Sequence, residues 1–152
     1  MRVKRKKRFC YEFPRPSLTV DVVLITIERK PKVLLIRRKN EPFAGRWAFP
    51  GGFVDENEPL ESAARRELHE ETGIKAGSLE QIGTFGDPER DPRGWTISVV
   101  FLGRVRPKGV RPKANDDAQE VGWHPLDAPP PLAFDHAEIL KAAASYLKGR
   151  RR

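Results

Sequence analysis

Apolar and β-branched residues recur along the chain in short blocks, separated by polar stretches that contain glycine or proline. This pattern is typical of strands, because strands are short and are bounded by turn residues. The blocks that predict strands are 18–27, 33–38, 79–85, 95–105 and the shorter 120–124. Between the second and third blocks, WAFPGGF at 47–53 predicts a short extended piece that runs into a glycine turn.

Two other stretches predict helices. A helix near 59–72 is expected because Pro59 suits a first turn and Gly73 is placed to cap the carboxyl end. A last helix is expected from Asp135, where Asp135 and Glu138 form the D-x-x-E pattern of a capping box. Strands interleaved with only two helices predict an α/β fold in which a mixed sheet packs between the helices.

Length and charge predict one domain with two basic ends. The 152 residues suit a single domain with a sizeable core. The formal net charge is +8, but residues 1–8 and 148–152 supply ten basic residues and no acidic one, which leaves 19 basic and 21 acidic residues elsewhere. We predict basic tails at 1–12 and 149–152 around a domain at 13–148. The tails are expected to be solvated, with weak, salt-sensitive contact to RNA or another polyanion as the alternative.

The sequence shows no disulfide pair, membrane span or signal peptide, and these features bear on the cellular compartment. The single cysteine, Cys10, cannot form an internal disulfide, which suits a reducing cytosol. The longest apolar run, 20–27, is too short to span a bilayer and is interrupted by Asp21 and Thr26. No signal-peptide hydrophobic region follows the basic start. The expectation is a cytoplasmic protein with no membrane contact.

The helix near 59–72 carries carboxylates at the border of its apolar side. At about 100° per residue, Glu67 and Glu71 lie one turn apart with Glu70 beside them. Like charges so placed repel one another unless cations join them, and hard oxygen ligands suit Mg²⁺ or Mn²⁺. Arg66 can grip a carboxylate, and Glu58 is within reach of Arg66. The alternative is a charged helix whose glutamates have no shared role.

The wider spacing of these residues matches a known motif. Gly52, five residues, Glu58, seven residues and then RELHEETGI at 66–74 match the Nudix box, so the chain resembles the Nudix hydrolases. The resemblance implies a Nudix-type α/β/α sandwich. It also implies metal-assisted hydrolysis of a diphosphate, in which metals polarise phosphoryl oxygens and lower the pKa of an attacking water.

The resemblance further implies roles for individual residues. Glu67, Glu70 and Glu71 are expected to bind Mg²⁺, with Mn²⁺ as a substitute, and the backbone carbonyl of Gly52 is a further expected ligand. Arg66 is expected at the catalytic centre, where it orients the carboxylates. Glu58 is expected to support Arg66 from behind, because metal sites generally need such outer partners.

Three other stretches resemble the ADP-ribose pyrophosphatase branch of the family: PRPSLTVDVVL at 14–24, GDPERDPRG at 86–94 and AFDHAEIL at 133–140. The loop at 86–94 offers carboxylates and guanidinium groups for ribose hydroxyls and phosphate oxygens. Its candidates are Asp87, Arg90, Asp91 and Arg93. The alternative is a turn that is stabilised by its own Asp–Arg pairs.

Other substrate contacts are more scattered along the chain. Arg15 and Arg37 are further candidates for phosphate binding. Trp47, Phe49 and Phe13 are candidates for stacking on adenine, and simple core packing is the alternative for each of them.

The general base has several candidates after the helix. NDDAQE supplies Asp116, Asp117 and Glu120, of which Glu120 is the preferred one because it precedes a strand. The alternative is a solvated acidic loop. The three histidines, His69, His124 and His136, form no ligand or triad pattern, and His136 is expected in a capping or surface position.

The function expected from these residues is Mg²⁺-dependent hydrolysis of a nucleoside diphosphate linked to another moiety, with ADP-ribose giving AMP and ribose 5-phosphate. The partner is therefore a small-molecule nucleoside diphosphate, and the resemblance also implies a homodimer. The alternatives are a nucleoside triphosphate pyrophosphohydrolase, a regulator that binds ADP-ribose without cleaving it, and hydrolysis of capped RNA ends. The regulator is disfavoured because the box is complete.

Overall fold

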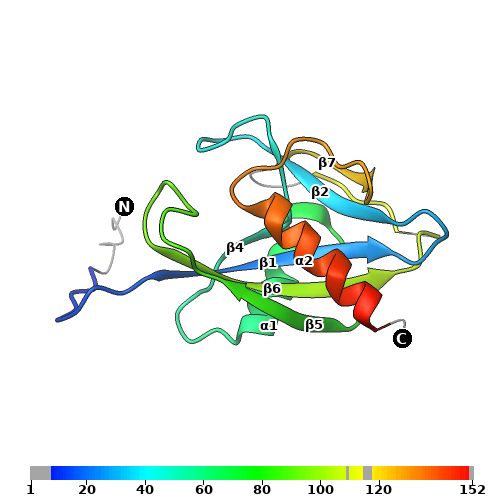
Figure 1. Ribbon diagram of the computed structural model, residues 1–152. Helices are drawn as coiled ribbons and strands as arrows, with labels where there is room; N and C mark the ends of the chain where they lie inside the picture. The colour runs from blue at the N-terminus through cyan, green and yellow to red at the C-terminus, as the bar shows by residue number, and fades with distance from the viewer. Residues whose placement is uncertain (1–7, 109, 115–117, 151–152) are drawn as a thin grey trace, which may run out of the picture.

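A computed structural model describes residues 8–108, 110–114 and 118–150 of the chain (Figure 1). The predicted strands and helices are all present, and WAFPGGF contributes two short strands. The strands are β1 (Ser17–Thr26), β2 (Lys32–Arg38), β3 (Trp47–Ala48), β4 (Gly51–Phe53), β5 (Leu79–Phe85), β6 (Thr96–Val105) and β7 (Ala118–Pro125). The helices are α1 (Leu60–Thr72) and α2 (His136–Gly149).

The strands form one mixed sheet with β1 at its centre. β1 pairs in parallel with β6 along its whole length, from Ser17 opposite Thr96 to Thr26 opposite Val105. The other pairings are antiparallel: β1 with β2 and β4, β2 with β3 and β7, and β5 with β6. β1 therefore pairs with strands from distant parts of the chain. Residues 19–21 of β1 pair with β4, the strand that precedes α1.

The two helices cover opposite faces of the sheet, with α2 in front of it in Figure 1. Alternate residues of β1 explain this arrangement, since successive side chains of a strand point to opposite faces. Val20, Val22 and Leu24 pack in the core that contains α1, whereas Val23 and Ile25 pack in the core that contains α2. Each fully buried aliphatic side chain of this kind stabilises the fold by roughly 1.5–3 kcal/mol. The predicted α/β/α arrangement is confirmed.

The helix ends agree with the sequence only in part. Gly73 caps α1 in the left-handed region with φ 72°, and its N–H bonds the carbonyl of His69, as predicted. The predicted capping box of α2 is wrong, because the Asp135 side chain makes no cap hydrogen bond and binds Arg90 instead. The predicted tail at 149–152 begins too early. α2 continues to Gly149, and Arg150 pairs with Glu80.

No helix among the described residues is both long and apolar enough to cross a membrane.

Candidate functional site

A cavity of about 420 Å³ opens between the start of α2, the β3–β4 region and the inner side of α1. Its lining contains two groups of charged side chains. We call Asp21, Glu67 and Glu71 the acidic wall, and Arg38, Arg90 and Arg93 the basic wall. The acidic wall comes from β1 and α1. The basic wall comes from the end of β2 and from the loop that precedes β6.

Glu71 is the most buried carboxylate that α1 contributes to the acidic wall. Its Oε2 accepts a hydrogen bond from the backbone N–H of Gly51 at 2.9 Å. Burial raises the pKa of Glu71 to about 8 against the opposing effect of the Gly51 N–H, and the nearby charges of Glu67 and Asp21 raise it further. Burial also raises the pKa of Glu67, against the opposing effect of Arg66. Without a cation, the protein therefore compensates the negative charge of the two carboxylates incompletely, and the protonated form of Glu71 is favoured at neutral pH.

Arg66 fixes the direction of Glu67. Its Nε and Nη2 donate to the two carboxylate oxygens of Glu58 at 2.8 and 2.9 Å, and its Nη1 donates to Glu67 Oε1 at 2.7 Å. Nη2 also donates to the carbonyl of Phe53 at 3.0 Å. The hydrogen bond from Arg66 lowers the pKa of Glu58 to about 2. The predicted pairing of Glu58 with Arg66 is confirmed.

A glycine is required where β4 passes α1. A Cβ on Gly52 would lie 2.6 Å from Cδ of Glu67, closer than real Cβ atoms approach other groups. The absence of a side chain thus lets the backbone of β4 lie directly against this carboxylate. Gly52 lines the cavity as well, so its backbone and the carboxylates of Glu67 and Glu71 border one space.

Glu70 does not join this group. Its side chain is 46% exposed, and it accepts a hydrogen bond from Arg66 Nη1 at 3.2 Å without lining the cavity. The expectation that Glu70 lies with Glu67 and Glu71 at the border of the apolar side is wrong, because Glu70 lies on the exposed side of α1, and its expected part in binding Mg²⁺ stays a prediction. Within the described ranges of the chain, no three His, Cys, Asp or Glu side chains form a ready-made metal cluster.

The donors that are present nevertheless suit a hard divalent cation. Glu67 and Glu71 offer carboxylate oxygens whose mutual repulsion a cation would relieve, and Gly52 brings backbone beside them. The acidic wall itself offers oxygen donors only, and the nitrogen donor beside it, His136 Nε2, faces Asp21 at 3.6 Å. The chemistry of the donor set therefore fits Mg²⁺ or Mn²⁺.

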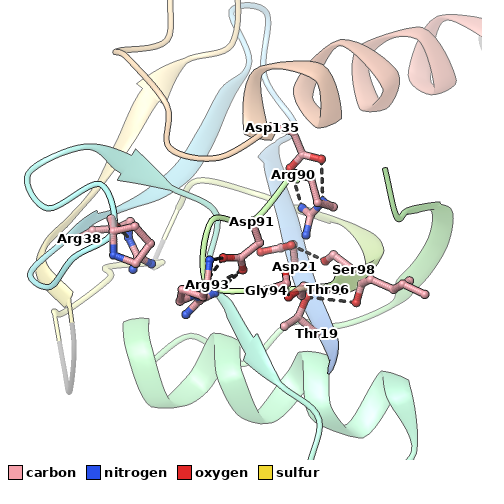
Figure 2. Close-up of polar contacts among 12 residues, drawn as sticks. Thr19, Asp21, Arg38, Arg90, Asp91, Arg93, Gly94, Thr96, Ser98 and Asp135 are labelled. Atoms are coloured by element: carbon pink, nitrogen blue, oxygen red, sulfur yellow. Dashed lines mark hydrogen bonds and ion pairs between the residues drawn. The ribbon is translucent and has the colours of Figure 1, made fainter. Parts of the chain in front are cut away.

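Two of the three arginines of the basic wall are held by carboxylates (Figure 2), whereas Arg38 donates from Nε to the carbonyl of Pro42 at 2.8 Å. Arg90 is buried, and its Nε and Nη2 donate to the two oxygens of Asp135 at 2.8 and 2.6 Å. Arg93 donates from Nη2 to Asp91 at 2.7 Å. Of the four predicted loop residues, Arg90, Asp91 and Arg93 line the cavity and Asp87 does not. The Asp91–Arg93 pair also bears out the alternative, in which the loop is stabilised by its own Asp–Arg pairs.

Phe134 lies between two arginines of the basic wall. The Arg38 guanidinium lies 4.8 Å from the centre of its ring and that of Arg93 lies 5.4 Å from it. Arg93 also lies 5.2 Å from the ring centre of Phe53. Phe134 adopts φ 50°, a left-handed conformation that is uncommon for an aromatic residue and that occurs where surrounding contacts impose it.

Several cavity residues were not found from the sequence. Asp21 is buried in β1, where Oδ2 accepts a hydrogen bond from the Ser98 hydroxyl (Figure 2). His136 is also buried, so the expected surface or capping position is wrong. The interruption of an apolar strand by Asp21 was a usable signal, because a buried charge needs partners. Phe134 and His136 lie in the stretch AFDHAEIL, whose resemblance to the ADP-ribose pyrophosphatase branch was a usable signal, whereas nothing in the local pattern marks Arg38.

Other predicted residues lie away from the cavity. Glu120 is exposed on β7 and pairs with Arg37 of β2 at 3.7 Å, and neither residue lines the cavity. Arg15 lies over the ring of Tyr11 at 4.0 Å, also outside the lining. Asp116 and Asp117 lie outside the described residues. The structure therefore does not bring these candidates together with the carboxylates of α1.

The aromatic candidates are engaged in packing. Trp47 packs edge-on against His124, with ring centroids 4.2 Å apart, and does not line the cavity. Phe49 does line it, but the ring is buried and stacks on His136. Phe13 is 71% exposed and lies outside the lining. Of the three, only Phe49 is placed to contact a molecule in the cavity.

Comparisons with known proteins agree with this geometry. The family model described as the NUDIX domain matches residues 15–143. An ADP-ribose pyrophosphatase of Methanocaldococcus jannaschii is 46% identical over 134 residues, which cover 88% of this chain and 76% of that protein. The NUDIX domain of Shewanella oneidensis NrtR complexed with ADP ribose is 38% identical and superimposes with a TM-score of 0.82, covering 89% of this chain and 90% of that chain.

A larger protein contains a similar domain. The bifunctional NMN adenylyltransferase/ADP ribose pyrophosphatase of Francisella tularensis, complexed with AMP and a Mn ion, is 30% identical with a TM-score of 0.76. The match covers 90% of this chain but only 43% of that protein.

Proposed function

The chain belongs to the Nudix family, and we propose that it hydrolyses the diphosphate of ADP-ribose to AMP and ribose 5-phosphate with Mg²⁺, for which Mn²⁺ can substitute. The observation that carries this proposal is the joining of two walls in one cavity, Glu67 and Glu71 on α1 with Arg90 and Arg93 of the loop before β6. The similarity to the pyrophosphatase of M. jannaschii supports the same substrate.

In this proposal the acidic wall holds the metal. Glu67 and Glu71 supply carboxylate oxygens, and the Gly52 carbonyl is the further ligand. A divalent cation bound there supplies charge that polarises the phosphoryl oxygens and lowers the pKa of the attacking water. Arg66 keeps Glu67 directed at the cavity, because three of its donors are fixed by Glu58 and by the carbonyl of Phe53.

The basic wall serves the substrate. Arg90 and Arg93 present guanidinium groups that suit phosphate oxygens, and Asp91 offers an acceptor for ribose hydroxyls. Because Asp135 and Asp91 already hold these arginines, little conformational freedom is lost when an anion binds. Phe49 is the remaining candidate for contact with a base or sugar.

The base that activates water stays a prediction. Glu120 remains a candidate from the sequence, although it lies within β7 and its carboxylate pairs with Arg37 outside the cavity. Glu70 is a second candidate, because it is exposed next to Arg66 and keeps access to solvent. Replacing Glu120 and Glu70 in turn with glutamine, and comparing kcat, distinguishes the two.

A panel of substrates tests the proposal. The purified protein is given ADP-ribose, 8-oxo-dGTP and a dinucleoside diphosphate with Mg²⁺ or Mn²⁺, and products are separated by chromatography. We expect ADP-ribose to exceed 8-oxo-dGTP by at least ~10-fold in kcat/KM, about 1.4 kcal/mol of discrimination. Equal rates, or a preference for the triphosphate, would identify a nucleoside triphosphate pyrophosphohydrolase. Tight binding of ADP-ribose without cleavage would identify a regulator.

A further inference from the structure

A histidine without a role in the proposed chemistry lies beneath the cavity, at the first residue of α2. His136 is 3% exposed, and its Nδ1 accepts a hydrogen bond from the backbone N–H of Phe49 at 3.0 Å. Because Nδ1 accepts, the neutral ring carries its hydrogen on Nε2, and burial, which lowers the pKa of His136, favours that neutral ring. Nε2 lies 3.6 Å from Oδ1 of Asp21. The two ring nitrogens therefore face different partners.

The amide that His136 binds begins the segment 49–52, which leads from β3 into β4 and touches both carboxylates of α1. Gly51, two residues after Phe49, donates its N–H to Glu71 at 2.9 Å. Gly52, the next residue, lies directly against the carboxylate of Glu67. The position of this short segment thus sets how the backbone meets the two carboxylates.

The segment has little room to move toward β1. A Cβ on Gly51 would lie 2.2 Å from the carbonyl oxygen of Val20 and 2.7 Å from Oδ1 of Asp21. The carbonyl of Pro50 also accepts a hydrogen bond from the N–H of Val22 at 2.8 Å. β1 therefore contacts the segment closely on one side and Glu71 binds it at Gly51, while His136 fixes its first amide.

We propose that His136 is a positioning residue for the candidate metal site, acting through Nδ1 on the Phe49 amide. By holding that amide, it places Gly51 against Glu71 and Gly52 against Glu67. This inference rests on the metal site of the proposed function but not on which nucleotide is cleaved. A buried N–H without an acceptor is unfavourable, so loss of Nδ1 makes the segment shift toward another partner.

Substituting His136 with asparagine or with glutamine distinguishes the roles of its two ring nitrogens. In His136→Asn, the side-chain oxygen falls near the place of Nδ1 and can accept from Phe49. In His136→Gln, the amide reaches the place of Nε2 toward Asp21 but leaves no acceptor at the δ position. Both variants lose the aromatic ring and its stacking on Phe49, so they are matched for that loss.

The decisive measurement is Mn²⁺ affinity without nucleotide, by isothermal titration calorimetry or electron paramagnetic resonance on the full chain. We expect His136→Gln to raise the Kd for Mn²⁺ by ~10-fold or more and His136→Asn to change it less than about threefold, since outer partners of metal ligands typically contribute 10- to 100-fold. Hydrogen exchange of the Gly51 amide should become faster in the glutamine variant alone.

Leu140→Ala is the control for lost stability. Leu140 lies one turn further along α2 and is buried in the core. Its truncation lowers the melting temperature, but we expect unchanged Mn²⁺ affinity where the protein remains folded.

The outcomes separate the two proposals. Wild-type Mn²⁺ affinity in His136→Gln, or equal losses in both variants, would overturn the role of His136 and leave the metal site standing. No Mn²⁺ binding by the wild-type protein would overturn the metal site and this inference with it. If His136→Gln does not fold, His136→Asn decides alone: unchanged affinity supports the role of Nδ1, and a tenfold loss refutes it.

Discussion

The acidic and basic walls of the cavity are built in different ways. In the acidic wall, Glu67, Glu71 and the groups that hydrogen-bond to them come from residues 51–71, folded as loop and helix, whereas Asp21 comes from β1. The basic wall combines residues from β2 and the loop at 86–94, and its Arg90 is held by Asp135, 45 residues further along the chain. The α1 part of the acidic wall is thus a local structure, whereas Asp21 and the basic wall join it only in the folded chain.

The two walls also differ in electrostatic balance. Burial is the largest single effect on the pKa of Arg90 and lowers it, but the hydrogen bond to Asp135 and the charges of the nearby aspartates together raise it overall. Asp91 shows the opposite directions. Burial raises its pKa, but the hydrogen bonds and charge of Arg93, with the charge of Arg90, together lower it. In the acidic wall, burial wins at Glu71. The charge of Arg90 is therefore compensated by carboxylates of the protein itself, whereas the charge of Glu71 is not and would be compensated by a bound cation.

The largest effect is expected at the acidic wall. Glu71→Gln keeps the shape and an oxygen that can accept from Gly51, but it removes the charge that binds a cation. We expect Mg²⁺-dependent kcat/KM to fall by at least ~10²-fold, since losses of 10- to 100-fold are typical even for outer partners of metal sites. Steady-state kinetics at a series of Mg²⁺ concentrations measures this loss of kcat/KM. Wild-type activity in the folded variant would refute the metal assignment.

The same carboxylate predicts how pH affects the metal-free protein. With a pKa of about 8, Glu71 keeps its proton in the folded protein at pH values where the unfolded chain has lost it. The folded state then binds more protons, so the free energy of unfolding falls as pH rises from about 4.5 to about 8. Urea unfolding in EDTA should show this fall in the wild type and a weaker one in Glu71→Gln. Identical pH profiles would contradict it.

Breaking the Arg90–Asp135 pair, which holds part of the basic wall, is expected to lower the free energy of unfolding. Asp135→Asn leaves the Arg90 guanidinium, whose side chain is 5% exposed, facing a neutral amide. Breaking a buried pair typically costs ~3–5 kcal/mol, and the partial exposure of Asp135 lowers the expected cost to about 2 kcal/mol. Urea unfolding measures the loss, with the exposed Asp127→Asn as control. We also expect KM for ADP-ribose to rise while Mn²⁺ affinity stays the same. A loss confined to Mn²⁺ affinity would mean that the two walls are not separate.

The contrast between the walls explains what the sequence could predict. The strands, the two helices and the box glutamates were predicted because periodicity and fixed spacing are local properties. The Arg66–Glu58 pair was predicted for the same reason, since both residues face each other across one turn and one loop. Glu70 was misplaced because the projection of a helix does not tell where packing ends and solvent begins.

Long-range contacts could not be predicted in this way. Asp135 matched a capping box, yet it binds an arginine of a distant loop, and that pairing overrides the local signal. His136 was expected at the surface because nothing in its neighbourhood places Phe49 beside it. Both errors fall at the cavity, where local preferences give way to contacts between elements.

A moderate effect on selectivity is expected from Arg93. Arg93→Ala removes a guanidinium that lies over Phe53 and Phe134 at the cavity, while the carboxylates of α1 keep their partners. We expect the preference for ADP-ribose over 8-oxo-dGTP to shrink by about tenfold, or about 1.4 kcal/mol, with a smaller loss on a dinucleoside diphosphate. Arg65→Ala, on the outer side of α1, is the control. An equal loss on all substrates would assign Arg93 to general phosphate binding.

The smallest effect is expected from the basic residues outside the two walls. Deleting residues 1–8 and 151–152 removes eight basic residues and no acidic one, which brings the formal net charge from +8 to zero. Arg150 is retained because it pairs with Glu80 and lies over the ring of Tyr146. α2 rises about 1.5 Å per residue, so the C-terminal end of its 14 residues lies about 20 Å from His136.

Charges beyond that end of α2 act weakly on the cavity, because the screening length at physiological salt is about 8 Å, and residues 1–8, which carry six of the eight charges, are expected from their sequence to be solvated. We therefore expect kcat/KM for ADP-ribose to stay within about twofold of the wild type at that salt, while the isoelectric point falls from about 9.9. Repeating the assay at low salt separates two exceptions. A loss seen only at low salt would show that the tails attract the anionic substrate from a distance. A loss at every salt concentration would mean that a tail contributes to the cavity, and the basic wall described here would be incomplete.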